Sequence, residues 1–435
     1  MAGRDGSACS HAYPQARQRV AGMHQRKYAL GVGPQRQCRK VRAVRLMTAV
    51  VGTMVASSLI SAQTARSIAI QISETTGIRR TEYPVSAQVN MPKGTLAAAR
   101  NAKLRLNDTE TPAQFSAESQ WDDGSVRVLD VDFNVSIGPG ESRTYSVDYG
   151  PDVTATPPAR GLSIDESAEA IGVANVKFGR SGSPLLASAN YRGELIGAGN
   201  NGVYVGDAAG LRRSLSAAES VKLDIVKRGP LLAVLQYTGR LPLSQDYAVA
   251  FTVTCEMPNS KSWVKTSIVI ADPGRRIKDV GLETPLALGE KPWLWDFGGE
   301  NGTYGAFRNA GDSARLQQTI ASAGNTWDVQ TGTQGELRPY ETAAANRAKT
   351  VFGWGHMLDA TRAVAFGIDR FGTERGKYTI SLNGQGLMTF RLEPEIPKTE
   401  HRLTVYQHFV STPVPIGAAT SPTAMLNPLV VVVKS

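Results

Sequence analysis

Cysteine is scarce in this sequence, and its placement excludes an internal disulfide framework. The chain has three cysteines, and two of them, Cys9 and Cys38, fall within the first 65 residues. Cys255 is then left alone in the strand-like run Phe251–Met257. A single thiol cannot form an internal disulfide, so we expect Cys255 to be buried as a small apolar side chain.

A strong net charge is also lacking once the N-terminal segment is set aside. The whole chain carries 48 Lys and Arg against 38 Asp and Glu. Residues 1–65 hold ten of the cationic residues and one acid, Asp5, which leaves 38 cationic against 37 acidic residues. A nearly neutral chain has no general electrostatic attraction to nucleic acid. We therefore expect no nucleic-acid partner.

No apolar run is long enough to span a bilayer comfortably. The uncharged segment Leu46–Ile60 follows the basic stretch Gln35–Arg45. A membrane-spanning helix needs about 20 apolar residues, whereas a basic stretch followed by a shorter apolar one is typical of a signal peptide. We expect cleavage after Ala62 or Ala65; a membrane anchor is the alternative. The sequence thus predicts export to a periplasm or the cell exterior, without a stable membrane anchor after cleavage, and export without disulfides favours a bacterial source.

Helical periodicity is almost missing, and alternation of apolar and polar residues takes its place. Period-two runs include Ser125–Phe133, Val221–Val226 and Tyr378–Leu382, and turn residues separate such runs. This pattern predicts an all-β protein with many antiparallel strands. The best helix candidate is the short stretch Glu341–Ala348.

The length of the chain and one proline-containing stretch predict two β domains. Gly150–Arg160 has no apolar periodicity and resembles an extended linker. We therefore divide the chain into a leader at residues 1–65, a small β domain at 66–150, a linker at 151–160 and a large β domain at 161–435.

Common catalytic and nucleotide-binding motifs are absent. The sequence has no H-E-x-x-H, G-x-S-x-G, P-loop or paired C-x-x-C motif, which argues against zinc, serine-hydrolase and nucleotide chemistry. Gly197–Gly202 matches G-x-G-x-x-G, but Val203–Val205 predicts a following strand, so we interpret the match as a hairpin turn. Asp130 and Asp132 share a strand face. Local pairing is the simpler interpretation and a Ca²⁺ site is the alternative; no other cofactor is evident.

Five short blocks in the N-terminal part occur in a characteristic order. They are Tyr83–Gly94, Ala102–Leu106, Pro112–Gln114, Trp121–Phe133 and Pro139–Glu141. Together they resemble the N-terminal RIFT-barrel domain of the exo-rhamnogalacturonan lyase and YetA-like family. Looser matches to the second, β-sandwich domain of that family follow at Arg228–Ala233, Ile277–Leu282, Gly353–His356 and Ala365–Phe371.

The resemblance does not extend to the helical toroid domain with which that family continues. It implies a small RIFT-type β-barrel followed by a large antiparallel β-sandwich of the supersandwich type. It also implies an exported protein that acts on a polysaccharide or oligosaccharide, specifically an acidic, rhamnogalacturonan-like or pectin-like glycan.

An elimination lyase of this kind needs a small set of side chains. β-Elimination at a uronate requires a base such as Tyr, His or Lys and a cation or amide that neutralises the sugar carboxylate. We expect His356 to act as the base and Arg362 or Arg370 to neutralise the carboxylate. Trp354 and Asp369 are expected to contact the substrate. The alternative for His356 is a structural role at the end of a strand.

Two tryptophans and two histidines each allow a functional or a structural interpretation. Trp293 and Trp295 are two residues apart and share one face of a strand, where they would form either a saccharide-stacking platform or part of the core. His401 and His408 are seven apart and should face opposite sides of one strand, which favours structural roles.

The sequence therefore predicts a lyase, with a non-catalytic glycan-binding or accessory protein as the alternative. A glycoside hydrolase is a third candidate and would need two carboxylates about 5 to 10 Å apart. The lyase hypothesis requires that His356, Arg362 and Arg370 converge in one cleft with Trp293 or Trp295.

Overall fold

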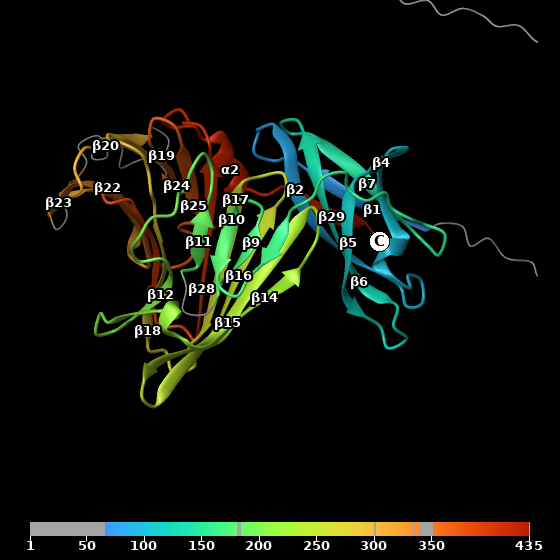
Figure 1. The fold of residues 1–435 in the computed structure, drawn as a ribbon, viewed down its shortest axis with the longest axis horizontal. Helices are drawn as coiled ribbons and strands as arrows, with labels where there is room; N and C mark the ends of the chain where they lie inside the picture. Colours follow the sequence, from blue (N-terminus) through green and yellow to red (C-terminus); the bar gives the residue numbers. More distant parts are fainter. Residues whose placement is uncertain (1–65, 181–183, 300–301, 334–335, 340–350, 435) are drawn as a thin grey trace, which may run out of the picture. The chain divides into compact units, whose positions relative to one another are not determined.

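The computed structural model describes residues 66–434 except 181–183, 300–301, 334–335 and 340–350. The leader with its two cysteines and the helix candidate Glu341–Ala348 lie outside the described residues. All the described residues belong to one compact unit. This unit is built almost entirely of antiparallel β-strands, so the all-β prediction is confirmed (Figure 1).

Two sheets form the N-terminal part of the fold. The five-stranded sheet has the order β29 (Val430–Lys434), β1 (Arg66–Ser73), β7 (Ser142–Tyr149), β3 (Ala102–Leu106) and β4 (Thr109–Thr111). The three-stranded sheet has the order β2 (Arg80–Asn90), β6 (Val126–Ile137) and β5 (Ala113–Gln120). In β2 every second residue from Tyr83 to Val89 is buried, as the alternating sequence dictates. These side chains pack with those of β1 and β6 in one apolar cluster.

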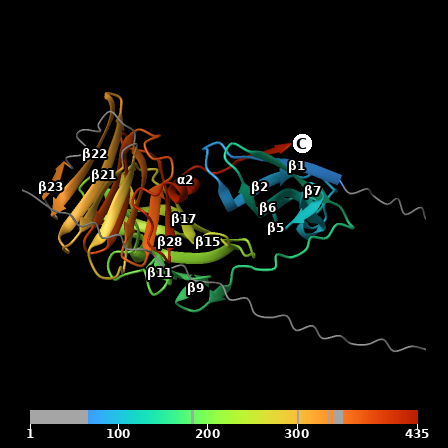
Figure 2. The same cartoon turned by 90° about the horizontal axis from the view of Figure 1, so that it is seen from above.

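The last strand departs from the predicted domain division. Residues 161–435 were all expected in the large domain, but β29 pairs with β1 in antiparallel register, from Ala69 opposite Lys434 to Ser73 opposite Val430 (Figure 2). The run Val430–Lys434 alternates between exposed and half-buried positions, which suits an edge strand. The two ends of the described chain are therefore joined in one sheet.

Two large sheets form the rest of the fold, here called the sandwich. The eight-stranded sheet has the order β13 (Arg212–Ser214), β12 (Gly202–Asp207), β18 (Ile277–Pro285), β27 (Leu387–Pro394), β26 (Gly376–Asn383), β21 (Asp312–Ala321), β22 (Gly324–Thr333) and β23 (Glu336–Pro339). The nine-stranded sheet has the order β14 (Glu219–Lys227), β15 (Leu232–Ser244), β16 (Tyr247–Pro258), β17 (Trp263–Ala271), β28 (Glu400–Val410), β25 (Ala363–Ile368), β24 (Val351–Leu358), β19 (Trp293–Gly299) and β20 (Thr303–Phe307).

The main core lies between these two sheets. Phe390 and Ile380 of the eight-stranded sheet pack in one cluster with Phe366 and Val405 of the nine-stranded sheet. Cys255 belongs to the same cluster and is a buried free thiol, as expected. A small sheet adjoins this core through buried side chains of its own; its order is β11 (Leu186–Ala189), β10 (Val176–Gly179), β9 (Ala170–Val173) and β8 (Ile164–Glu166).

Helix is confined to short pieces among the described residues. Helix α2 (Thr420–Leu426) packs on β25, where Leu426 lies so close to Gly367 that a Cβ there would meet its side chain at 2.9 Å. Two 3-10 turns, η1 (Ala99–Asn101) and η2 (Leu215–Ala217), connect strands. In the described ranges no helix has the length and apolar character needed to cross a bilayer.

Candidate functional site

The outer face of the eight-stranded sheet carries polar side chains on nearly every strand. Cross-strand partners share a face, so the registers define rows that cross the sheet. One row runs Ser214, Tyr204, Gly281, Arg391, Thr379, Gln317, Asp328. The next row runs Glu283, Thr389, Ser381, Arg315, Gln330. The other face of these strands supplies core residues such as Val280 and Leu316.

Tyr204 is the centre of the most developed part of this face. Its ring lies against Gly281, because a Cβ on that glycine would meet the Tyr204 ring and hydroxyl at 2.3 to 2.5 Å. The Arg212 guanidinium covers the same ring, with Cζ 4.3 Å from the centroid. Arg212 Nη1 also donates to Glu283 Oε1 at 2.8 Å. Tyr204, Arg212 and Glu283, together with the pair described next, are called the Tyr204 cluster below.

A second ion pair lies beside the first. Arg391 Nη2 donates to Asp279 Oδ2 at 2.6 Å and lies 3.2 Å from Glu393 Oε2. Asp279 sits over Gly206, where any Cβ would meet the carboxylate at 2.7 to 2.9 Å. Two glycines thus make room for one phenol and one carboxylate on the same sheet face.

Three polar atoms of the Tyr204 cluster are buried and have no protein partner. They are the Tyr204 hydroxyl, Asp279 Oδ1 and Arg391 Nε. Buried polar groups are nearly always hydrogen-bonded, so unpaired atoms of this kind indicate a place where a ligand group or ordered water belongs. Burial raises the pKa of the Tyr204 hydroxyl even though Arg212 lowers it, so this group stays protonated at neutral pH.

A pocket opens at the edge of the Tyr204 cluster. It has a volume of about 390 Å³ and is lined by Tyr204, Arg212, Glu283 and the loop Gly199–Asn201. The side chain of Arg212 is 50% exposed, so part of its guanidinium faces the pocket. The pocket combines one phenol, one cation, one carboxylate and two amides, which is a suitable set for hydroxyl and carboxylate groups of a sugar.

His356 lies elsewhere, on the outer face of the nine-stranded sheet. Its Nδ1 atom is 2.8 Å from Asp296 Oδ1, and both side chains are 1% exposed. The other carboxylate oxygen of Asp296 accepts from the Gly417 backbone N–H at 2.7 Å. His356 therefore ties two strands to the segment before α2, which corresponds to the structural alternative for this residue.

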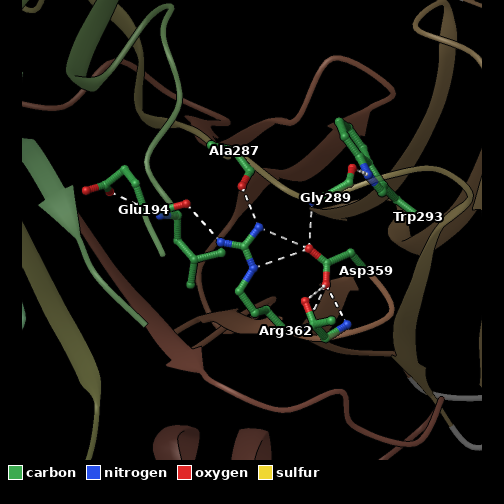
Figure 3. A network of polar contacts seen from close by, with 8 residues as sticks. Glu194, Ala287, Gly289, Trp293, Asp359 and Arg362 are labelled. Carbon is green, nitrogen blue, oxygen red and sulfur yellow. Dashed lines mark hydrogen bonds and ion pairs between the residues drawn. The ribbon is translucent and has the colours of Figure 1, made fainter. Parts of the chain in front are cut away.

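Arg362 is held in a buried network (Figure 3). Its guanidinium donates to Asp359 Oδ2 at 3.2 and 3.3 Å and to the backbone oxygens of Glu194 and Ala287, each at 2.9 Å. Burial raises the pKa of Asp359, but hydrogen bonds from Gly289 N–H and from the Thr361–Arg362 turn outweigh it and lower the pKa to about 2. Each of the three guanidinium nitrogens of this arginine thus donates to a group of the protein.

The structure does not bring the expected catalytic residues together in one pocket. Arg362 and Arg370 lie beyond opposite ends of β25, which at six residues is about 20 Å long. Arg370 is exposed and lines a pocket of about 420 Å³ with Trp354, but neither His356 nor Arg362 lines it. Asp369 is half-buried, and burial raises the pKa of its carboxyl although Arg370 lowers it.

Trp293 and Trp295 share a face of β19, but that face is the core. Their exposed fractions are 8% and 3%, and both belong to the apolar cluster between the large sheets. Trp293 Nε1 donates to Gly289 O at 2.7 Å, next to the Arg362 network in Figure 3. Of the two alternatives, platform or core, the structure supports the core.

The remaining motif interpretations have mixed outcomes. Lys227 Nζ of β14 lies 3.0 Å from a carboxylate oxygen of both Asp130 and Asp132, so the two acids are paired, but with a lysine 95 residues from Asp132 rather than with a local partner. Within the described ranges no cluster of three or more His, Cys, Asp or Glu side chains is arranged to hold a metal ion. β12 begins at Gly202, so a strand follows the Gly197–Gly202 match as predicted, but the hairpin interpretation is wrong, because β12 pairs with β13 and β18 and not with the preceding strand β11. His401 and His408 face opposite sides of β28, toward Asp272 and Ser421 respectively.

Sequence reasoning missed the Tyr204 cluster because its members come from four strands. One signal was available. In Asp279–Glu283 and Gly202–Gly206 the apolar residues alternate with acid, glycine and tyrosine, which predicts a strand face of polar groups spaced by glycine. The sequence does not show that these two faces are the same face.

Comparisons with known proteins show only distant structural likeness. No protein-family model and no curated protein matches the chain. A glycosyl hydrolase family 38 protein from Enterococcus faecalis aligns with 85% of this chain at 10% identity and a TM-score of 0.48, and the chain spans 47% of that protein. A galactose mutarotase related enzyme from Lactobacillus acidophilus aligns with 59% of this chain at 10% identity and a TM-score of 0.29, over 99% of its own length.

Proposed function

We propose that this protein binds an acidic glycan on the polar face of the eight-stranded sheet and cleaves it by β-elimination at the Tyr204 cluster. The observation that carries the proposal is the convergence of Tyr204, Arg212 and Glu283 in one pocket, with the Tyr204 hydroxyl unpaired. The resemblance to exo-rhamnogalacturonan lyases supports the same class of substrate. The residues proposed for the reaction differ from those that the sequence suggested.

The roles follow from charge and exposure. The half-exposed guanidinium of Arg212 is placed to bind the uronate carboxylate and so make the proton on the adjacent carbon more acidic. When the sugar carboxylate takes Arg212, Glu283 loses its cationic partner and accepts a proton more readily. Substrate binding would thus activate the base.

The elimination moves one proton to Glu283 and one proton from Tyr204 to the leaving oxygen. Glu283 takes the proton next to the carboxylate, the electron pair of that C–H bond forms the new double bond, and the bond to the glycosidic oxygen breaks. The leaving oxygen needs a proton, which the Tyr204 hydroxyl supplies because burial keeps it protonated at neutral pH. Arg391 and Asp279 lie beside this site and would contact the neighbouring sugar unit.

A non-catalytic glycan-binding protein is the second candidate function. It is favoured by the extent of the polar face, which continues across the sheet from β13 to β22, far beyond a single reaction centre. Hydrogen bonds from such a face would bind a chain of sugars without any chemical step.

The test uses polygalacturonate and rhamnogalacturonan, with neutral galactan as the comparison glycan. Ultraviolet absorbance of unsaturated uronates reports elimination, and titration calorimetry reports binding. We expect Glu283→Gln to abolish the absorbance increase while the affinity changes by less than about threefold, and Arg212→Gln to weaken binding at least tenfold. Glu400→Gln is the matched control, since Glu400 is an exposed glutamate paired with an arginine, Arg402, on β28.

Three results would decide between the alternatives. Binding without any absorbance increase would favour the glycan-binding protein. An absorbance increase that persists in Glu283→Gln would contradict the assignment of the base. No measurable binding of either acidic glycan would overturn both functions.

A further inference from the structure

A second pocket lies between the N-terminal sheets and the nine-stranded sheet, within the one compact unit of the described residues. Its volume is about 260 Å³. One wall comes from β2 and β6, and the opposite wall comes from the ends of β15, β16, β17 and β28. No residue of this pocket belongs to the Tyr204 cluster. Ligand sites occur preferentially at such junctions between packed parts of a protein.

Three aromatic rings line the pocket. Tyr83 projects from β2, Trp263 from β17 and Tyr406 from β28. The Trp263 ring packs edge-on against both tyrosines, with centroids 5.9 and 6.3 Å away. These contacts hold the three rings in place before any ligand binds, so the ring edges that face the pocket form a preformed wall.

The two tyrosine hydroxyls are the next feature of the wall. Among the described residues neither hydroxyl takes part in a hydrogen bond. Burial raises the pKa of Tyr83 to about 12 and also raises that of Tyr406, so both groups are neutral hydroxyls that can donate and accept. Neither is among the buried polar atoms without a partner, which places both hydroxyls where a pocket ligand can reach them.

Two carboxylates face the pocket, and a lysine pairs with each. Asp132 accepts from Ser86 Oγ at 2.6 Å and from Lys227 Nζ at 3.0 Å on the N-terminal side. Glu256 accepts from Lys265 Nζ at 2.9 Å on the sandwich side. Lys265 balances Glu256, whereas Lys227 is shared between Asp132 and Asp130, so the lining has no uncompensated cation that would attract an anion and at most one carboxylate charge in excess.

We propose that this pocket binds one uncharged sugar ring, as a second saccharide site separate from the Tyr204 cluster. The sugar would present its hydroxyls to Tyr83, Tyr406 and the free lone pairs of Asp132 and Glu256, and its apolar C–H edge to the aromatic wall. Hydroxyl groups donate and accept at once, which matches a lining made of phenols and paired carboxylates. Pockets for drug-sized ligands measure about 300 to 1,000 Å³, so 260 Å³ suits a single ring rather than a chain.

The site would also have a mechanical consequence. A sugar held by Asp132 on one side and Glu256 on the other bridges the N-terminal sheets and the sandwich, because these residues come from β6 and β16. Ligand binding would then stabilise the folded protein and raise its melting temperature by mass action.

The experiment titrates the full-length protein with four probes by calorimetry: galactose and rhamnose as uncharged sugars, galacturonate as the anion and galactosamine as the cation. We expect an uncharged sugar to bind at least tenfold more tightly than either charged probe. Tyr83→Phe and Tyr406→Phe should each weaken its binding about fivefold, and Asp132→Asn more than tenfold. Tyr304→Phe, at an exposed tyrosine of β20, is the matched control.

Circular dichroism and the melting temperature establish that each variant is folded. Tyr204→Phe should leave the affinity for the uncharged sugar unchanged. Loss of that affinity in folded Tyr204→Phe would place the sugar at the Tyr204 cluster and overturn the second site. The proposal would also be overturned if no uncharged sugar bound, or if galacturonate or galactosamine bound more tightly. The same holds if all three pocket variants kept the affinity of the natural protein for the uncharged sugar.

Discussion

Nδ1 of His356 lies 2.8 Å from Oδ1 of Asp296, and the two side chains are almost completely buried between strands β24 and β19. Gly417 donates to the second oxygen of the same carboxylate. One acid therefore satisfies two groups that come from distant parts of the sequence, and the segment leading to α2 is tied to the sheet. A pairing of this kind explains a buried histidine without any role in catalysis.

The first prediction concerns His356→Gln. The shorter amide keeps polarity but cannot reach Asp296 in the same geometry, so we expect a loss of about 1 to 3 kcal/mol in the free energy of unfolding. Urea unfolding monitored by fluorescence measures it. The affinity of the folded variant for polygalacturonate should be unchanged within about twofold. A tenfold or greater loss of affinity for polygalacturonate would instead indicate that His356 takes part in glycan binding.

Many strands of this fold could be predicted because their apolar and polar residues alternate with period two, although β25 and β18 are buried on both faces. The run Ser125–Phe133 became β6, and Tyr378–Leu382 lies within β26, since in both one face is core and the other is not. Burial on alternate residues is a local property, and local patterns survive in a single sequence. The joining of β29 to β1 is not local, which is why the predicted large domain wrongly included the last strand.

The site was harder to predict because its residues meet only through the registers of the sheet. Arg362 illustrates the difficulty: its partners Glu194 and Ala287 are 168 and 75 residues away, and both contribute backbone oxygens, which carry no side-chain signature. An arginine near an aspartate looks the same in sequence whether it binds a substrate or a loop. Only burial separates the two cases.

The second prediction uses this network. Arg362→Lys keeps the charge but loses the planar fork that serves Asp359, Glu194 O and Ala287 O together. We expect the free energy of unfolding to fall by about 2 to 3 kcal/mol, because the buried Asp359 carboxylate and two part-buried carbonyls lose their donor. Arg402→Lys, at an exposed arginine of β28, should change it by less than about 0.5 kcal/mol. Equal effects of the two substitutions in chemical unfolding would contradict the structural role of Arg362.

The third prediction is a pH dependence of stability that comes from His408. This side chain is surrounded by the Trp263 ring and Ser421, and burial, together with Lys261 and His356, lowers its pKa from 6.5 to about 4. Between these values the unfolded chain binds a proton that the folded protein does not. Stability is therefore complete above about pH 6.5 and falls as the pH drops toward 4, by up to about 3 kcal/mol.

The variant His408→Gln tests whether His408 causes this dependence of stability on pH. The glutamine can still bond to Ser421 but does not titrate, so the melting temperature of the variant should vary less between pH 4.5 and 7.5 than that of the natural protein. His401, whose pKa burial also lowers, accounts for part of the remaining slope. An unchanged slope in His408→Gln would show that the histidine is already charged in the folded state.

The fourth prediction disturbs the Tyr204 cluster without touching any of its polar groups. Gly281 has no side chain to lose, but a Cβ at this position would lie 2.3 Å from Cζ of Tyr204, far closer than van der Waals contact allows. In Gly281→Ala the ring must swing away, and Arg212 loses the surface on which it rests. We expect the affinity for polygalacturonate to fall at least tenfold, and any elimination activity with it, in a protein that still folds because the strand backbone is unstrained.

Gly311→Ala is the control, since a Cβ there meets nothing within 4 Å. Full affinity in a folded Gly281→Ala variant would mean that the glycan binds without the Tyr204 ring, and the proposed reaction centre would have to lie elsewhere on the polar face.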